Sequence, residues 1–265
     1  MIVKACYITN TGKIRMKNED SLLLNELLIS ETGMDKTCCL SSEDPKRIYI
    51  VADGMGGHAK GEIASRTVLS VFKEGYKEAE SIDDIKETIL SSKRRLNGLV
   101  EADKSRYGMG TTVTGILMIN GKGIIFNCGD SRVYGIKDGF PEKLTWDHSI
   151  VQALVDGGII TEDEMRRHPQ KHLMTSSVMG DLRSELPEVF FREIDIRDGD
   201  KFLLCSDGLW ESVDTRVIRE CYAQGNLKEA VQCLFEKTMA YGAPDNVTII
   251  GLEIKDGCPG MQLKK

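Results

Sequence analysis

The stretch that decides the fold spans residues 51–58 and reads Val-Ala-Asp-Gly-Met-Gly-Gly-His. It continues the apolar run from Arg47 to Ala52, which predicts a β-strand, so Asp53 stands at a strand end before a glycine-rich turn. Glycine has no Cβ, so backbone carbonyl groups or a phosphate can approach this carboxylate. The stretch indicates a site for a hard metal ion or a phosphoester, although a lone aspartate at a strand end is more often a turn or cap residue.

Further acidic residues stand at the ends of other strand-like runs, namely Glu19-Asp20, Asp130, Asp207 and Asp245. Strand ends at one edge of a sheet sandwich lie close together, so we expect these carboxylates to converge. Carboxylates without histidine or cysteine select Mg²⁺ or Mn²⁺ over zinc. Two such ions ~3.5–4 Å apart can clamp both oxygen atoms of a phosphoryl displacement. Arg15 then stands where it could hold the phosphate by a bidentate contact.

Length and charge narrow the class of protein. The chain has 265 residues, of which 41% are hydrophobic, and no linker or internal repeat, so we expect one domain over residues 1–265. A net charge of −6 with dispersed Lys and Arg argues against nucleic acid or an anionic membrane as the partner. The N-terminus lacks the apolar core of a signal peptide and no run is long enough to span a membrane, which predicts a cytoplasmic location.

The eight cysteines are predicted to be free thiols. Cys6, Cys128, Cys205 and Cys233 lie within apolar runs, and no Cys-x-x-Cys occurs, so buried thiols are favoured over disulfides or zinc ligands. The pair Cys38-Cys39 lies in the polar segment 30–46, which is predicted to be an exposed loop inserted between strands. We favour an inert loop there over a redox-sensitive one.

The hydrophobic periodicity predicts an α+β fold. Apolar residues recur at helical spacing over 64–76 and over 82–99. From Thr111 to Leu144 short β-rich runs are separated by turns, which predicts antiparallel sheet. Residues 170–187 lack periodicity and are predicted to be a surface flap over a site. Blocks of antiparallel strands with segregated helices indicate helices that cover packed sheets.

Seven motifs, in this order over nearly the whole chain, resemble those of the metal-dependent serine/threonine protein phosphatases of the PP2C (PPM) type, in particular the compact bacterial members. Any one of them is weak evidence, whereas seven in order are specific. They are Arg15-x-x-Asn-Glu19-Asp20, Asp53-Gly-Met-Gly-Gly57-His58, Gly110-Thr-Thr112, Gly129-Asp-Ser-Arg132, Leu144-Thr-x-Asp-His148, Ser206-Asp-Gly-Leu-Trp210 and Asp245-Asn-Val-Thr248.

The resemblance implies a fold and a set of site residues. The fold is a sandwich of two central antiparallel sheets flanked by helix pairs (αββα), with a flap over about residues 148–187. Arg15 matches the arginine that contacts the substrate phosphate. Asp20 is implied to act through bound water or through contacts behind the residues that ligate the metal ions. Asp130 is implied to help hold a third, weaker metal ion. Two catalytic Mn²⁺ or Mg²⁺ ions are implied to be bridged by Asp53 and completed by the Gly54 carbonyl, Glu19, Asp207 and Asp245.

The resemblance also implies an activity, which is hydrolysis of phosphoserine and phosphothreonine by in-line attack of a metal-bridging hydroxide. The implied partners are phosphorylated proteins, including a cognate serine/threonine kinase, and we expect a soluble monomer. A cysteine-dependent phosphatase is excluded, because no cysteine is followed by five residues and Arg. A phosphotransferase with an aspartyl nucleophile is excluded, because its motif Asp-x-Asp-x-Thr/Val is absent. The remaining alternative is a pseudophosphatase that keeps the fold and binds a partner.

The sequence departs from the family pattern at one chemically important position. Many eukaryotic members have a histidine, a candidate general acid, where this chain has Met55, so the proton donor to the leaving group is not identified. The histidines of the chain have other expected roles: His58 and His148 are predicted to be structural, and His168 and His172 lie in the flap region.

Overall fold

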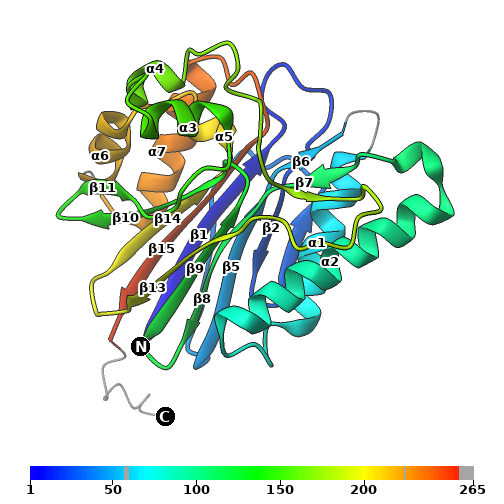
Figure 1. Ribbon diagram of the computed structural model, residues 1–265. Helices are drawn as coiled ribbons and strands as arrows, with labels where there is room; N and C mark the ends of the chain where they lie inside the picture. The colour runs from blue at the N-terminus through cyan, green and yellow to red at the C-terminus, as the bar shows by residue number, and fades with distance from the viewer. Residues whose placement is uncertain (57–59, 224, 257–265) are drawn as a thin grey trace.

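The computed structural model describes residues 1–56, 60–223 and 225–256 (Figure 1). His58, with its predicted packing role, lies outside these ranges. The described residues form two six-stranded antiparallel sheets and one three-stranded sheet. In spatial order the first sheet contains β11 (Phe140–Lys143), β10 (Arg132–Lys137), β14 (Lys201–Cys205), β15 (Val247–Lys255), β1 (Ile2–Asn10) and β4 (Cys38–Ser42).

The second sheet lies against the first, and a small sheet extends it at one end. In spatial order the second sheet contains β13 (Phe190–Asp195), β9 (Lys122–Cys128), β8 (Val113–Ile119), β5 (Lys46–Ala52), β2 (Ser21–Leu24) and β3 (Leu27–Ser30). The small sheet contains β12 (Val178–Met179), β7 (Gly110–Thr111) and β6 (Gly54–Met55).

Helices cover the outer faces of the two large sheets. Figure 1 shows α1 and α2 on the right of the sandwich and α6 and α7 on the left. The predicted periodic segments 64–76 and 82–99 are helical, as α1 and α2. The helices are α1 (Gly61–Gly75), α2 (Ile82–Ala102), a 3₁₀ turn (Lys104–Arg106), α3 (Ile150–Asp156), α4 (Glu162–Met165), α5 (Asp207–Trp210), α6 (Thr215–Ala223) and α7 (Leu227–Ala240).

Strand alternation divides the apolar residues among three buried layers. Along β5, Tyr49 and Val51 point between the two sheets, whereas Ile48 and Ile50 point toward α1 and α2. Successive side chains of a strand point to opposite faces, so a strand in the middle of such a stack is apolar on both. The arrangement is the αββα sandwich predicted from the sequence. No helix among the described residues is long and apolar enough to cross a membrane.

The segment 30–46 differs from its prediction as an exposed loop. Its residues Cys38–Ser42 form β4, which pairs with β1 at the edge of the first sheet. The pattern was not visible in the sequence because an edge strand with a solvent-facing side carries polar residues that a turn would also carry. Residues 170–187 do lack regular structure apart from β12.

The prediction of free thiols is wrong for four cysteines. The pairing of β1 with β4 places Cys6 opposite Cys39, and their Sγ atoms are bonded. The antiparallel hairpin of α6 and α7 likewise brings Cys221 to Cys233. Local spacing of cysteines does not reveal either bond, because both bonds join elements that meet only in the fold. Three described cysteines are free: Cys128 and Cys205, which are buried as predicted, and the exposed Cys38.

Candidate metal and phosphate site

The predicted acidic residues converge in one cavity of about 280 Å³ at the end of the sandwich. Each stands next to a strand end: Asp53 follows β5, Asp207 follows β14 and Asp245 precedes β15. Because β14 and β15 are antiparallel neighbours, the last residue of one and the first of the other lie at the same edge. The predicted residues that line the cavity are Arg15, Glu19, Asp53, Gly54, Asp130, Asp207 and Asp245.

Hydrogen bonds to its backbone hold Asp53 at the end of β5. The Thr111 hydroxyl donates to the Asp53 carbonyl at 2.8 Å, and the Asp53 amide donates to the Thr112 hydroxyl at 2.9 Å. The two threonines therefore fix the backbone that carries this carboxylate. The Asp53 side chain remains free to face the cavity.

Gly54 is required by close packing. A Cβ at this position would overlap the carbonyl oxygen atoms of Glu19 and Gly61. A Cβ at Gly61, the first residue of α1, would lie 2.9 Å from the carboxyl carbon of Glu19. The two glycines therefore let the turn after β5, the start of α1 and Glu19 meet at the rim of the cavity.

Asp20 is the predicted residue that does not line the cavity. It is fully buried, and the Ser206 hydroxyl donates to its Oδ2 at 2.8 Å. Burial raises the pKa of Asp20 to about 7, against the lowering effect of hydrogen bonds from Thr248 and Ser206. Asp20 thus lies behind the cavity-lining carboxylates, and its indirect role stays a prediction.

The cavity carries a concentration of negative charge. Burial raises the pKa values of Asp53 and Asp207 well above the usual range, and neighbouring carboxylates raise them further. The pKa of Asp130 is raised to about 7 by burial and then by Asp147. Within the described part of the chain, Asp20 Oδ1 and Asp207 Oδ1 are buried without a hydrogen-bond donor. Crowded carboxylates with unsatisfied oxygen atoms fit divalent cations, which need several oxygen ligands.

Arg15 brings a positive charge to the rim. Its Nη2 lies 2.6 Å from Asp245 Oδ2, and about half of the Arg15 side chain is exposed. The exposed part of a guanidinium at the mouth of the cavity can still receive a phosphate through its other donors.

Asn246 also lines the cavity, and the sequence assigned no role to it. Its Oδ1 accepts from the Glu19 amide at 2.8 Å, and its Nδ2 donates to the carbonyl groups of Thr11 and Lys17. One side chain thereby fixes the loop that carries Arg15 and Glu19 against the start of β15. Its position directly after Asp245 was the signal that could have identified it.

Buried groups below the cavity support Asp130. The Trp210 indole donates to the Asp130 carbonyl at 2.9 Å and stacks on the Arg132 guanidinium, whose carbon lies 3.6 Å from the ring centroid. Arg132 also binds Asp147 through Nε at 2.9 Å and Nη2 at 2.5 Å. Arg132 is thus paired with a nearby carboxylate, and Trp210 packs in the core beneath the cavity.

The other predicted structural histidine is buried beneath the same loop. His148 Nδ1 accepts from the Gly129 amide at 3.3 Å, which confirms a structural role for this ring. His172, by contrast, lines the cavity itself, together with Met174. The sequence predicts that His172 lies in the flap region, but no sequence pattern indicates that it lies in the same cavity as the aspartates.

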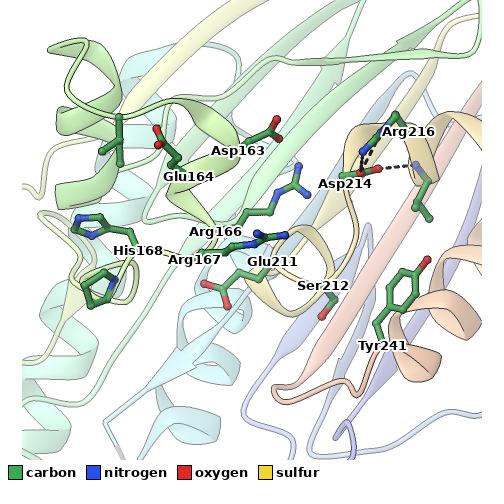
Figure 2. A pocket seen from close by; sticks show the side chains of 13 residues that line it. Asp163, Glu164, Arg166, Arg167, His168, Glu211, Ser212, Asp214, Arg216 and Tyr241 are labelled. Carbon is green, nitrogen blue, oxygen red and sulfur yellow. Dashed lines mark hydrogen bonds and ion pairs between the residues drawn. The ribbon is translucent and has the colours of Figure 1, made fainter.

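A larger cavity of about 820 Å³ lies between α4 and the start of α6 (Figure 2). Its lining includes Arg166, Arg167, His168 and Glu211, and it was not predicted from the sequence. Glu211 follows Asp207 by one helical turn, so this side chain stands between the larger cavity and the aspartate cavity.

Comparisons with known proteins agree with this geometry. Residues 35–240 match the family model described as protein phosphatase 2C. The chain is 30% identical to the serine/threonine protein phosphatase PstP of Mycobacterium tuberculosis over 259 residues, which is 97% of this chain and 46% of PstP. It therefore spans about half the length of that relative. It is also 30% identical to the serine/threonine phosphatase stp of Listeria innocua, over 93% of this chain and 94% of stp.

Solved structures show the same similarity in three dimensions. The catalytic domain of PstP in complex with two manganese ions has a TM-score of 0.78 at 30% identity, and the match covers 97% of this chain and 100% of that one. Stp1 from Staphylococcus aureus has a TM-score of 0.78 at 30% identity, with 95% and 94% covered.

Proposed function

This chain belongs to the protein phosphatase 2C family, and from that membership we propose that it is a metal-dependent phosphatase for phosphoserine and phosphothreonine in proteins. The observation that carries the proposal is the convergence of Asp53, Asp207 and Asp245 with Arg15 in one cavity. A complete acidic set beside a phosphate-binding cation supports catalysis over the alternative of a pseudophosphatase.

The carboxylates would hold two Mn²⁺ or Mg²⁺ ions. Asp53 would contact both, and the Gly54 carbonyl, Glu19, Asp207 and Asp245 would complete the ligands, with Asp130 contributing to a weaker third ion. This donor set contains only oxygen atoms, which suits these hard cations. When bound, the ions supply Lewis-acid stabilisation of the phosphoryl group and lower the pKa of water.

The protein side chains would orient the substrate. Arg15 would exchange part of its contact with Asp245 for the phosphate oxygen atoms, through charge-assisted hydrogen bonds. Asn246 would hold Arg15 and Glu19 at a fixed position relative to Asp245, through its hydrogen bonds to the loop that carries them. Asp20 would remain behind the ligands and hold Ser206 at the end of β14.

The substrates proposed are phosphorylated proteins of the cytoplasm, including a partner serine/threonine kinase, and the chain is proposed to act as a monomer. The relatives support a protein substrate, because they are named as serine/threonine phosphatases. The lining of the cavity is mainly charged and polar, which suits a phosphate group more than one particular peptide side chain.

The experiment that tests the function is hydrolysis of a phosphothreonine peptide and of p-nitrophenyl phosphate with Mn²⁺, with Mg²⁺ and with EDTA. We expect release of phosphate with a divalent ion, none with EDTA, and none from the Asp53→Ala variant. The matched control is Asp195→Asn, which alters an exposed aspartate in β13. A folded chain without activity under any metal condition would support the pseudophosphatase instead.

A further inference from the structure

The larger cavity between α4 and the start of α6 has no role in the proposed function. Its volume of about 820 Å³ exceeds the 280 Å³ of the aspartate cavity. Three arginines line it: Arg166 and Arg167 directly follow α4, and Arg216 belongs to α6. Three arginines in one cavity of a chain whose net charge is −6 indicate a site for an anionic group.

The carboxylates that line the same cavity are largely compensated. Glu164 accepts hydrogen bonds in the capping box at the start of α4. Asp214 is paired with Arg216, and Glu211 is paired with a lysine from the segment before β12. The fourth carboxylate, Asp163, is exposed to solvent. The negative charge of the lining therefore leaves the arginines at the end of α4 available to a ligand.

Arg166 and Arg167 find no ion-pair partner among the residues that the structure describes. Figure 2 shows both guanidinium groups pointing into the cavity, and none of its dashed lines reaches them. The turn that carries them is fixed, because the Arg167 amide donates to the Glu164 carbonyl at 3.1 Å and the His168 amide donates to the buried Met165 at 3.2 Å. Each guanidinium offers five N–H donors, so the turn presents an anion with a dense set of donors.

One side chain separates this cavity from the aspartate cavity. Glu211 lines the larger cavity and His172 lines the aspartate cavity, and His172 Nδ1 lies 3.9 Å from Glu211 Oε1. An extended peptide advances ~3.3 Å per residue. A substrate with one phosphorylated residue in the aspartate cavity therefore reaches the larger cavity within a few residues.

We propose that the larger cavity is a second subsite, which binds a phosphate group a few residues away from the phosphoserine or phosphothreonine that is hydrolysed. The proposal rests on the proposed function, because it names a substrate class for the same enzyme. Arg166 and Arg167 bind this phosphate by paired, charge-assisted hydrogen bonds. Ser212 and Tyr241 line the same cavity, and their hydroxyl groups donate further bonds. The preferred substrates are then protein segments with two phosphorylated residues.

Peptides with a single hydrolysable phosphate test the subsite. Each carries one phosphothreonine and, about two to six positions away on either side, a non-hydrolysable phosphonate analogue of phosphoserine, a glutamate or an alanine. We would measure kcat/KM with saturating Mn²⁺ for the wild type and for Arg166→Ala/Arg167→Ala. The matched control is Arg94→Ala/Arg95→Ala, which removes two neighbouring exposed arginines from α2.

We expect kcat/KM of the wild type and of the control to be at least about tenfold higher for the best phosphonate peptide than for its alanine counterpart, since a charge-assisted hydrogen bond contributes this much. In Arg166→Ala/Arg167→Ala this ratio should fall to about one. The ratio is taken within one protein sample, so it does not depend on the folded fraction. A wild-type ratio near one at every spacing, or an unchanged ratio in the variant, would overturn the subsite. An equal gain from glutamate would overturn its assignment to phosphate.

A binding measurement separates this subsite from the proposed function. Fluorescence anisotropy of a labelled peptide with phosphonates at both positions needs no turnover. The wild type should bind it at least about tenfold more tightly than a peptide with one phosphonate, and Arg166→Ala/Arg167→Ala should lose this difference. The difference in a chain without activity would support the subsite and refute only the proposed function. Hydrolysis of the phosphothreonine peptide without this difference would refute the subsite alone.

Discussion

Arg15 Nη2 lies 2.6 Å from Asp245 Oδ2, although 230 positions separate the two residues in the chain. The contact raises the pKa of Arg15, chiefly through this hydrogen bond. It joins the residue proposed to hold the substrate phosphate to one proposed to hold a metal ion. Binding of phosphate and binding of metal are therefore expected to influence each other through this pair.

Arg15→Ala should raise KM for a phosphothreonine peptide about 10- to 100-fold, because a charge-assisted hydrogen bond contributes ~1.5–3 kcal/mol. Arg15→Lys should recover part of this loss, since it keeps the charge without the bidentate geometry. Steady-state kinetics at saturating Mn²⁺ measures both. An unchanged KM in Arg15→Ala would remove this residue from the phosphate site.

Asp207→Asn and Asp245→Asn should lower kcat/KM at least about 100-fold, because loss of a metal ligand costs no less than loss of a residue behind it. The thermal midpoint of Asp207→Asn in EDTA should equal or exceed that of the wild type, because the substitution removes one charge from crowded carboxylates. Kinetics and thermal denaturation test the two statements. Near-normal turnover in either variant would contradict the metal assignment, and Asp195→Asn serves as the control.

Arg132→Met should lower the free energy of unfolding by about 3–5 kcal/mol, because it leaves Asp147 charged and buried without its main partner. The double variant Arg132→Met/Asp147→Leu should regain much of this loss. Arg94→Met, which breaks an exposed pair with Glu87, should change the free energy by less than about 1 kcal/mol. Urea denaturation measures all three, and a loss in Arg132→Met no larger than in Arg94→Met would show that the buried pair contributes little.

His148 should make stability fall at acidic pH. Burial lowers the pKa of His148 in the folded chain, so as the pH falls the unfolded chain takes up this proton first. The contribution of neutral His148 to the free energy of unfolding is complete above about pH 6.5. Below that pH it declines by at most about 1.4 kcal/mol per pH unit. We expect the difference in free energy of unfolding between wild type and His148→Asn to shrink from pH 8 to pH 5. A difference independent of pH would mean that the ring titrates as it does in the unfolded chain.

Much of the fold was predictable because its signals are local. The short β-rich runs between turns and the helical spacing over 64–76 and 82–99 appear in short windows of sequence, and both led to the observed elements. The acidic residues were predicted for the same reason, since each lies within two residues of a strand end. The order of the seven motifs then indicated the family.

What the sequence by itself determined is which residues stand at strand ends and which faces of strands and helices are apolar, because both follow from the few residues on either side. The tertiary structure alone decided the contacts set by long-range register and packing: the Cys6–Cys39 bond, the burial of Asp20 behind the cavity, the clamp formed by Asn246, and the meeting of His172 with Glu211. These contacts join segments separated by tens to hundreds of residues. Their partners are fixed only when the sheets stack and exclude water, so no local pattern records them.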